Sequence, residues 1–272
     1  MGVVGGARQI VMGAGYWLKP ARIRDLPHLT LAMGSALASG AKMPEAADIR
    51  SRPPGFAGIA WNPAPAAVVE AARRGFYPHA HIGPMKWWSP PRRGVMMLDE
   101  VHLPKRFRRT LRNTDMVVTI DRAFQRVLEA CAAPRPGRPH LTWLTPRAQA
   151  LYNRLHAAGH AHSVEVWDSG GNLVGGVFGV DVDPVFSALS MFHTVDDASK
   201  LAIVSLYHHL SHRGFIAVDH QVISGWVRDL GGVEMDRDAY GALLDRPSAA
   251  SPDAWRALFT PAQTAEWRVE HR

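Results

Sequence analysis

The chain is poor in cysteine and has no long apolar run. Cys131 is its single cysteine, so an internal disulfide cannot form, and we expect a buried structural thiol. The apolar stretch 29–38 is interrupted by Gly34 and is shorter than the ~20 residues of a membrane-spanning helix. The N-terminus lacks the basic region and long apolar region that make a secretory signal. We therefore expect a cytoplasmic protein without a membrane partner.

Several motifs of catalysis and cofactor binding are also missing. The glycine-rich run 175–179 is similar to a phosphate loop, but the Lys-Ser/Thr pair of that loop is absent. No Gly-x-Ser-x-Gly nucleophile elbow occurs. His208 and His212 stand four residues apart without the carboxylate of a His-Glu-x-x-His zinc helix, which is more typical of a solvated helix face. The sequence therefore gives no support for a metal site or a nucleotide-phosphate loop.

Positive charge is present in excess. The 272 residues carry a formal net charge of +7, with 47% hydrophobic and 20% charged residues, and the pI is about 10.0. This composition is typical of a globular protein, and its charge favours a polyanionic partner, either nucleic acid or an anionic membrane surface. Many basic proteins bind no nucleic acid, so charge alone does not identify the partner.

The basic segment 105–112 is a candidate contact for a phosphate backbone. It looks helical, with Phe107 and Leu111 between its cations. Such a helix could lay its cations along nucleic acid or simply form a solvated surface. The candidate cations are Lys105, Arg106, Arg108 and Arg109.

A second basic segment follows two tryptophans. Arg92 and Arg93 come just after Trp87 and Trp88 in a proline-rich stretch. Guanidinium groups beside aromatic rings suit an unpaired nucleotide end. Tryptophans in such a loop are also common packing residues, so both interpretations remain open.

Apolar periodicity predicts the secondary structure. Helices are expected over 64–74, 105–112, 122–132 and 146–158, with Asp121 as a cap and a strand over 117–120. The segment 76–93 is expected to be an ordered loop because of its prolines and glycines. Beyond residue 160 the pattern predicts strands over 163–167, 173–180, 185–192 and 215–220, and helices over 200–212 and 226–230. This order predicts an α+β fold with helices packed on a sheet.

Asp219 and Gln221 are the strongest candidates for chemistry. They stand two apart on a predicted strand, so regular alternation would place both on one face. Their neighbours are apolar, and a buried carboxylate or amide needs partners. The pair could be a structural hydrogen-bond network, or it could orient an incoming amine and shuttle its proton.

The order of five motifs resembles one protein family. WWSPPRRGV at 87–95, GHAHSVEVW at 159–167, SMF at 190–192, ASK at 198–200 and DHQV at 219–222 resemble, in order and spacing, the leucyl/phenylalanyl-tRNA–protein transferases. The similarity covers roughly residues 58–232. It implies a small N-terminal domain and a C-terminal acetyltransferase-like (GNAT-like) α/β domain. We assign residues 1–55 to an N-terminal extension, 56–104 to the small domain and 105–272 to the acetyltransferase-like domain.

The resemblance implies an activity and a set of site residues. Family members move a leucyl, phenylalanyl or methionyl group from charged tRNA to the N-terminal amine of a protein, which tags it for degradation. They use neither a metal nor a nucleotide cofactor, because the aminoacyl ester is already activated. Asp219 and Gln221 match the Asp-x-Gln of the reaction centre. The residues implied to bind the aminoacyl group or the 3′ adenosine are Trp167, Ser190, Met191, Ile203 and Val218.

Four positions depart from the family pattern. Leu189 replaces a glutamate of the surface that receives a basic N-terminal residue, and His79 replaces a nucleotide-contacting tryptophan. The segment 61–65 replaces a Gly-Gly-Asp-Leu-Ser helix start, and Ser224 replaces an asparagine. The reaction-centre pair survives while substrate-facing positions differ, so the acceptor or the amino acid is expected to be altered.

Other functions stay open at this point. The same tRNA-dependent chemistry could act on a small-molecule amine in a biosynthetic pathway, or the chain could be an inactive tRNA-binding protein. An acetyl-CoA-dependent acyltransferase would share the fold, but no pyrophosphate loop follows Arg213 and Gly214. The expectation is therefore a monomeric aminoacyltransferase with aminoacyl-tRNA as its co-substrate.

Overall fold

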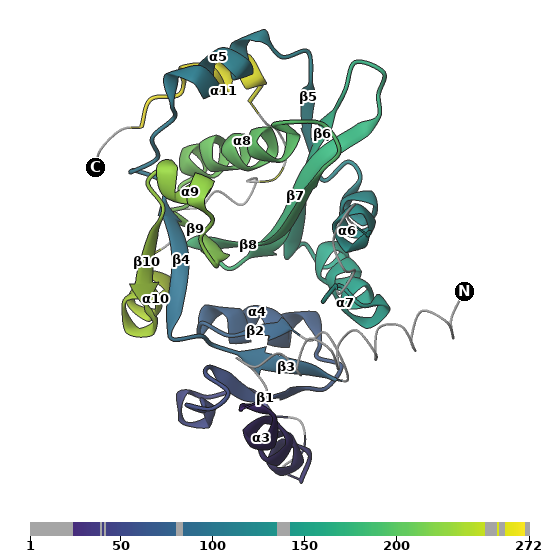
Figure 1. Ribbon diagram of the computed structural model, residues 1–272, viewed down its shortest axis with the longest axis vertical. Coiled ribbons are helices and arrows are strands. Elements are labelled where there is room, and N and C mark those ends of the chain that lie inside the picture. Colours follow the sequence, from purple (N-terminus) through teal and green to yellow (C-terminus); the bar gives the residue numbers. More distant parts are fainter. Residues whose placement is uncertain are drawn as a thin grey trace. The chain divides into compact units, whose positions relative to one another are not determined.

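The computed structural model describes residues 24–38, 40, 42–79, 84–134, 142–247, 255 and 259–269. Residues 1–23 of the expected N-terminal extension lie outside this part of the chain. The chain divides into two compact units, Met1–Pro91 with Ala132–Tyr152, and Arg92–Cys131 with Asn153–Arg272 (Figure 1). The expected domain boundaries after residues 55 and 104 stay a prediction.

The first unit contains a small antiparallel sheet with the strand order β1-β3-β2. Pro78 lies on β2 at the edge of this sheet, where its missing N–H costs no ladder bond. In α4, Pro65 stands at the first position, and Val68 and Val69 are buried. The elements are α3 (Leu26–Ala38), the short 3₁₀ helix η1 (Ala46–Asp48), β1 (Phe56–Ala60), α4 (Pro65–Arg73), β2 (Tyr77–His79) and β3 (Met85–Trp88).

The described part of the second unit forms a seven-stranded sheet with the order β10-β4-β9-β8-β7-β6-β5. β8 and β9 pair in parallel, and the other neighbours pair antiparallel. The strands are β4 (Arg92–Met97), β5 (Val117–Ile120), β6 (Ala161–Trp167), β7 (Leu173–Asp181), β8 (Val185–His193), β9 (Ala217–Gln221) and β10 (Val233–Asp236). The helices are α5 (Lys105–Asn113), α6 (Phe124–Ala132), α8 (Ala198–His212), α9 (Gly225–Asp229), α10 (Arg237–Leu244) and α11 (Pro261–Glu266). Helix α7 (Pro146–Ala157) runs from the first unit into the second.

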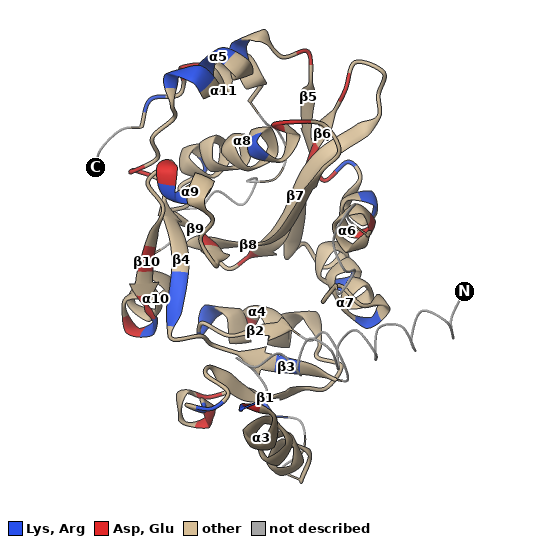
Figure 2. Ribbon diagram, viewed as in Figure 1, with Lys and Arg blue, Asp and Glu red and all other residues tan. Residues whose placement is uncertain are grey.

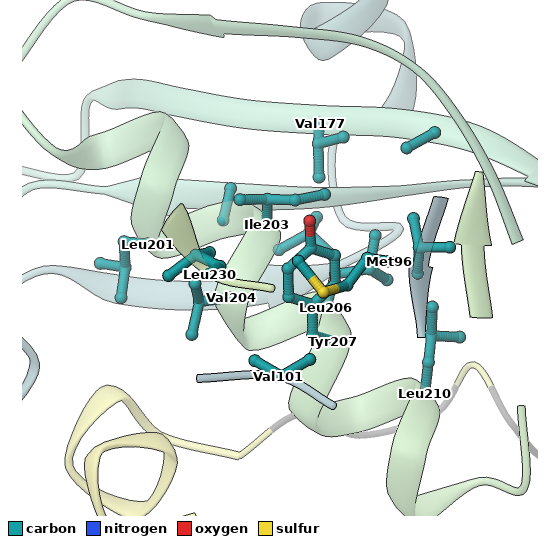
Figure 3. Packing of buried hydrophobic residues seen from close by; sticks show 14 of the residues in the cluster. Met96, Val101, Val177, Leu201, Ile203, Val204, Leu206, Tyr207, Leu210 and Leu230 are labelled. Carbon is teal, nitrogen blue, oxygen red and sulfur yellow. The ribbon is translucent and has the colours of Figure 1, made fainter. Parts of the chain in front are cut away.

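Helix α8 supplies the centre of the hydrophobic core. Nearly all of its side chains are buried, and Ile203, Leu206 and Tyr207 lie among side chains of the sheet and of the connecting segments (Figure 3). Val177 of β7 and Met96 of β4 belong to the same cluster. Burying one such side chain stabilises the fold by about 1.5–3 kcal/mol, so α8 holds the sheet in place. Among the described residues no helix is long and apolar enough to cross a membrane.

The structure confirms the mixed α and β class and most elements with clear periodicity, and it corrects three local predictions. The segment 76–93 is not a loop, because it forms β2, β3 and the start of β4. Asp121 does not cap α6: its carboxylate accepts hydrogen bonds from the backbone N–H of Ser163 and from the His162 ring. His208 is not solvated, because it is buried and stacks on Phe259.

Candidate active site

Asp219 lies at the centre of a buried polar network. Its side chain is 0% exposed, and its carboxylate forms an ion pair with Arg93 at 3.1 Å. The hydroxyl groups of Ser187 and Tyr240 each donate a hydrogen bond to Oδ2 at 3.2 Å. The Arg93 guanidinium also lies over the Tyr240 ring, 4.6 Å from its centre. Residues from β4, β8 and α10 thus satisfy a carboxylate that β9 places inside the protein.

The second oxygen of Asp219 holds Gln221 in an unusual backbone conformation. The Gln221 backbone N–H donates to Asp219 Oδ1 at 2.7 Å, and Gln221 has a φ of 60°. Because this φ lies in the left-handed region, the alternation of a regular strand ends here. Regular strand alternation therefore does not determine which face the Gln221 side chain takes, contrary to the prediction that it shares a face with Asp219.

The side chain of Gln221 has an unused donor. Its Nε2 is buried and has no hydrogen-bond partner in the described part of the chain. An unpaired buried amide costs about 1–3 kcal/mol, which makes this side chain a candidate for contact with a ligand.

Gly94 is required opposite Gln221. The two residues pair across β4 and β9, next to a register shift in β4. A Cβ added at Gly94 would lie 2.7 Å from the backbone nitrogen of Ile223, which is closer than real Cβ contacts. A side chain here would displace the segment that follows Gln221.

His220, between the two candidates, pairs with a different part of the protein. Its Nε2 shares a hydrogen bond with the hydroxyl of Tyr207 on α8. Burial lowers the pKa of His220 to about 4, although the Asp219 carboxylate acts in the opposite direction. Burial also raises the pKa of the Tyr207 hydroxyl well above its usual value. Both groups are therefore neutral near pH 7.

The residues expected to bind the aminoacyl group lie around α8 and β8. Ile203 and Val218 are fully buried in the core, and the half-buried Met191 packs against the same cluster. The parallel pairing of β8 with β9 ends at Ser187 and Asp219, although β8 continues to His193. Ser190 and Met191 therefore lie beyond the region of β8 that pairs with β9, although both still pair with β7.

Trp167 lies at another end of the sheet. The register aligns Asp219 with Ser187, Ser187 with Val180, and Val180 with Ala161. Trp167 stands six residues farther along β6 than Ala161, a distance of about 20 Å at ~3.3 Å per residue. By this register, Trp167 does not lie at the level of Asp219.

The basic residues predicted to contact tRNA divide into two groups. Lys105, Arg106 and Arg109 are exposed on α5 (Figure 2). Arg92 is also exposed, at 61%, and donates to the carbonyl of Glu234.

The other two arginines point into the protein. Arg108 donates to the carbonyls of Leu103, Ala265 and Trp267, so it ties α5 to the segment around α11. Desolvation lowers the pKa of Arg108. The side chain of Arg93 is 3% exposed and faces Asp219. In this structure, the buried Arg93 cannot offer its guanidinium group to a phosphate on the surface, and this corrects the expectation for Arg93. Arg108 is half-buried, and its Nε and Nη1 already have protein partners.

Sequence reasoning missed several residues around the candidates. Nothing local marks Ser187 or Tyr240 as partners of Asp219, because the contacts form only when distant strands pair. In the first unit, the rings of His79 and Trp143 stack with centroids 5.1 Å apart, and Trp143 also contacts Tyr152. The described residues contain no group of three or more His, Cys, Asp or Glu side chains placed to hold a metal ion.

Comparison with known proteins gives consistent results. The family model described as leucyl/phenylalanyl-tRNA protein transferase matches residues 95–245. A leucyl/phenylalanyl-tRNA–protein transferase of Nitratidesulfovibrio vulgaris is 42% identical over 219 residues, which cover 80% of this chain and 88% of that protein. The protein of the same name from Laribacter hongkongensis is 40% identical over 192 residues, covering 70% of this chain and 82% of the relative.

A likeness among solved structures is much weaker. L-PGS from Bacillus licheniformis is 9% identical, with a TM-score of 0.37, over 58% of this chain and 66% of that one.

Proposed function

This chain belongs to the leucyl/phenylalanyl-tRNA–protein transferase family, and from that premise we propose how its residues perform aminoacyl transfer. The chain is an aminoacyltransferase that moves a leucyl or phenylalanyl group from charged tRNA to the N-terminal amine of a protein. The reaction is an aminolysis. The α-amine attacks the ester carbonyl, a C–N bond forms, and the ester C–O bond breaks. The leaving oxygen of the 3′-terminal ribose takes up the proton that the amine loses.

Gln221 is proposed as the residue that touches the reacting groups. The observation that carries this assignment is its buried Nε2, which has no partner among the described residues, on a backbone held at a φ of 60°. A carboxamide can donate through Nε2 and accept through Oε1. It can thus orient the ester carbonyl and the incoming amine together, and such orientation lowers the barrier of a reaction between two bound groups.

Asp219 is proposed as a positioning residue. Its oxygens already accept hydrogen bonds from Ser187, Tyr240 and the backbone of Gln221, and Arg93 balances its charge. Both carboxylate oxygens are occupied by protein partners and the side chain is fully buried, so the carboxylate is not presented to a substrate. Its effect on transfer is exerted through the conformation of Gln221.

The aminoacyl side chain is proposed to bind between β8 and α8. The half-buried Met191 and Ser190 of β8 offer accessible surface there, and the fully buried Ile203 and Val218 lie in the core beneath. Burial of a leucyl or phenylalanyl side chain gains about 25 cal/mol per Å² of apolar surface, whereas a charged side chain would lose its hydration. This site would select bulky apolar amino acids.

The tRNA body is proposed to contact the outer face of α5. Lys105, Arg106 and Arg109 are exposed there, and Arg92 adds a further exposed cation in the same unit. Each such contact with a phosphate releases a counterion, so binding would weaken as salt rises.

The second unit is proposed to have an acetyltransferase-like architecture. The parallel β8–β9 pair within an otherwise antiparallel sheet, with α8 connecting the two strands, supports this proposal. The aminoacyl ester supplies the activation, so we propose that the reaction needs no cofactor. We also propose a monomer that works in the cytoplasm, where charged tRNA occurs.

The test is transfer of radiolabelled amino acids from total charged tRNA to a protein with an N-terminal Arg or Lys. Labelling by leucine or phenylalanine that RNase abolishes is the expected result. Labelling that persists after RNase treatment would contradict tRNA-dependent transfer. Labelling of a small amine instead of the protein would contradict the protein acceptor.

A further inference from the structure

His220 is an extra residue in the pairing of β9 with β4. Val95 of β4 lies opposite Asp219. Gly94, the residue before it, lies opposite Gln221, so β9 advances by two residues where β4 advances by one. This is a β-bulge, which bends a strand and changes the direction of its side chains. His220 therefore has no partner residue on β4, and its contacts come from elsewhere in the fold.

A tight turn around Gln221 follows the bulge. The backbone N–H of Val222 donates to the carbonyl of His220 at 2.6 Å, and the φ of Gln221 between them is 60°. A hydrogen bond of this span around a residue with positive φ defines the rarer form of the γ-turn, which is strained. Such a conformation costs about 1–3 kcal/mol and persists only where the surrounding structure holds it. The side chain proposed to touch the reacting groups therefore stands on backbone that other residues must support.

The side chain of the extra residue is held from α8. His220 Nε2 shares a hydrogen bond with the Tyr207 hydroxyl, and the two rings meet edge to face with centroids 5.7 Å apart. Tyr207 is 0% exposed, and within the described part of the chain its hydroxyl has His220 as its one partner. A buried hydroxyl that loses its partner costs about 1–3 kcal/mol, so this contact fixes the position of both rings.

The same contact connects the turn to the helix that underlies the proposed aminoacyl site. Tyr207 follows Ile203 by four residues, so both side chains lie on one face of α8 within the core (Figure 3). Ile203 lies in the core beneath the accessible surface of Ser190 and Met191. One helix face therefore supports both the surface proposed for the aminoacyl side chain and the backbone that carries Gln221.

The pair acts through its position and not through proton transfer. Burial lowers the pKa of His220 to about 4 and raises the pKa of Tyr207 well above its usual value, so both groups are neutral near pH 7. Tyr207 is also fully buried, so it cannot touch a substrate. Any influence on the reaction passes through the backbone of β9.

We propose that Tyr207 is a positioning residue for aminoacyl transfer: its hydroxyl fixes the bulge at His220, and the bulge fixes the turn that presents Gln221. The proposal rests on the proposed function, in which Gln221 orients the ester carbonyl and the incoming amine. Without the hydroxyl, His220 loses its anchor on α8 and the strained turn relaxes. The carboxamide of Gln221 then leaves the position in which it meets the reacting groups.

The main test removes one oxygen atom. Y207F retains the ring and its packing, and Y152F is the matched control, because Tyr152 on α7 is also a fully buried tyrosine. Transfer from charged tRNA is measured as kcat and KM. Y207F should lower kcat at least about tenfold and change KM less than about twofold, because misplaced groups slow the reaction without weakening substrate binding. Y152F should retain the parental kcat. A parental kcat in Y207F, or an equal loss in both variants, would overturn the proposal.

Variants of His220 test the other side of the contact. A glutamine amide can take the place of the imidazole Nε2 and keep the hydrogen bond, whereas leucine cannot. H220Q should retain most of kcat, and H220L should fall as far as Y207F does. The double variant Y207F/H220L should fall no further, because all three proteins lose the same contact. If the loss in the double variant equals the product of the two single losses, the residues act independently and the proposal is wrong.

The background without the Gln221 side chain separates positioning from a general effect on the core. Glycine adopts a φ of 60° without support and has no side chain to place. Y207F should therefore lower transfer less than about twofold when it is added to Q221G, against at least about tenfold in the parent chain. A tenfold loss in both backgrounds would show that Tyr207 acts on something other than Gln221, contrary to the proposal.

Amide hydrogen exchange tests the hold on the turn without a transfer assay. The Gln221 N–H, which donates to the buried Asp219 carboxylate, should exchange at least about tenfold faster in Y207F and at the parental rate in Y152F. If the unmodified chain transfers no amino acid while the exchange rates differ in this way, the proposed function fails and the hold of Tyr207 on the turn is supported. An unchanged exchange rate of the Gln221 N–H in Y207F would refute that hold, whatever the transfer assay shows.

Discussion

The guanidinium of Arg93 lies 3.1 Å from the carboxylate of Asp219, and both side chains are almost completely removed from solvent. Arg93 comes from the first residues of β4, whereas Asp219 lies on β9, so the ion pair joins two neighbouring strands of the sheet. Each charge makes the burial of the other tolerable. The proposed reaction-centre motif is therefore also part of the structural core of the second unit.

Replacing Arg93 is expected to lower the free energy of unfolding more than it lowers the affinity for RNA. R93M leaves Asp219 as an unpaired buried charge, so the free energy of unfolding should fall by about 3–5 kcal/mol. The control R92M changes an exposed neighbour and should stay within about 0.5 kcal/mol of the parent chain. Urea unfolding measures both. An R93M protein of parental stability would mean that Asp219 does not depend on this partner.

Removal of the Gln221 side chain is expected to separate activity from stability. Glycine accepts a φ of 60° without strain, so Q221G should be as stable as the parent or slightly more stable. Transfer from charged tRNA should fall by about 10²-fold or more, because a group that orients the reacting atoms is lost. V222A, at the exposed next residue, is the matched control. Transfer by Q221G at the control rate would rule out the assigned role.

Replacing Arg108 is expected to affect stability, whereas replacing its neighbour Arg109 on α5 is expected to affect tRNA binding. R108M removes a charged donor from three carbonyl groups and should lower the free energy of unfolding by about 1–3 kcal/mol. R109M changes an exposed side chain and should lower tRNA affinity and its salt dependence while stability is retained. Thermal unfolding and tRNA anisotropy on the two proteins give the comparison. The opposite pattern would reverse the assignment of these two residues.

Acid is expected to destabilise the protein partly through His220. The unfolded chain takes up a proton on this histidine near pH 6.5, whereas the folded chain does so only near pH 4, because burial lowers the pKa. Stability that is present above pH 6.5 is therefore lost as the pH falls towards 4, by up to about 3 kcal/mol. H220Q should show a shallower decline over this interval, measured by urea unfolding at several pH values. Because the pKa of His208 is also lowered to about 4, protonation of His208 should still cause part of the loss of stability in H220Q.

Leu189 is expected to influence the choice of acceptor. It is half-buried on β8 at the position where the family resemblance implies a glutamate. L189E would place a carboxylate near a basic N-terminal residue and should raise kcat/KM for peptides that begin with Arg or Lys. L189Q is the control for polarity without charge. A similar gain with both variants would argue against an electrostatic effect.

The sequence by itself determined the elements whose information is local. Helix α8 and strands β5 to β8 follow from apolar periodicity, because period and side-chain burial are properties of a few adjacent residues. The Asp-His-Gln motif and its neighbours likewise identified the family without any knowledge of their surroundings. The prolines and glycines of residues 76–93 misled the prediction, because pairing with strands elsewhere in the chain overrode local propensity.

Only the tertiary structure decided what the individual polar residues do. Arg93 and Arg92 are equivalent in the sequence, yet one is buried against Asp219 and the other is exposed. Arg108 and Arg109 also differ, because Arg108 is half-buried and donates to carbonyl groups at the end of α11, whereas Arg109 is exposed. A charged side chain is defined by its partners and its exposure. Asp219 for Arg93 and Ala265 for Arg108 stand more than a hundred residues away in the chain, so the fold had to bring them together before the roles could be assigned.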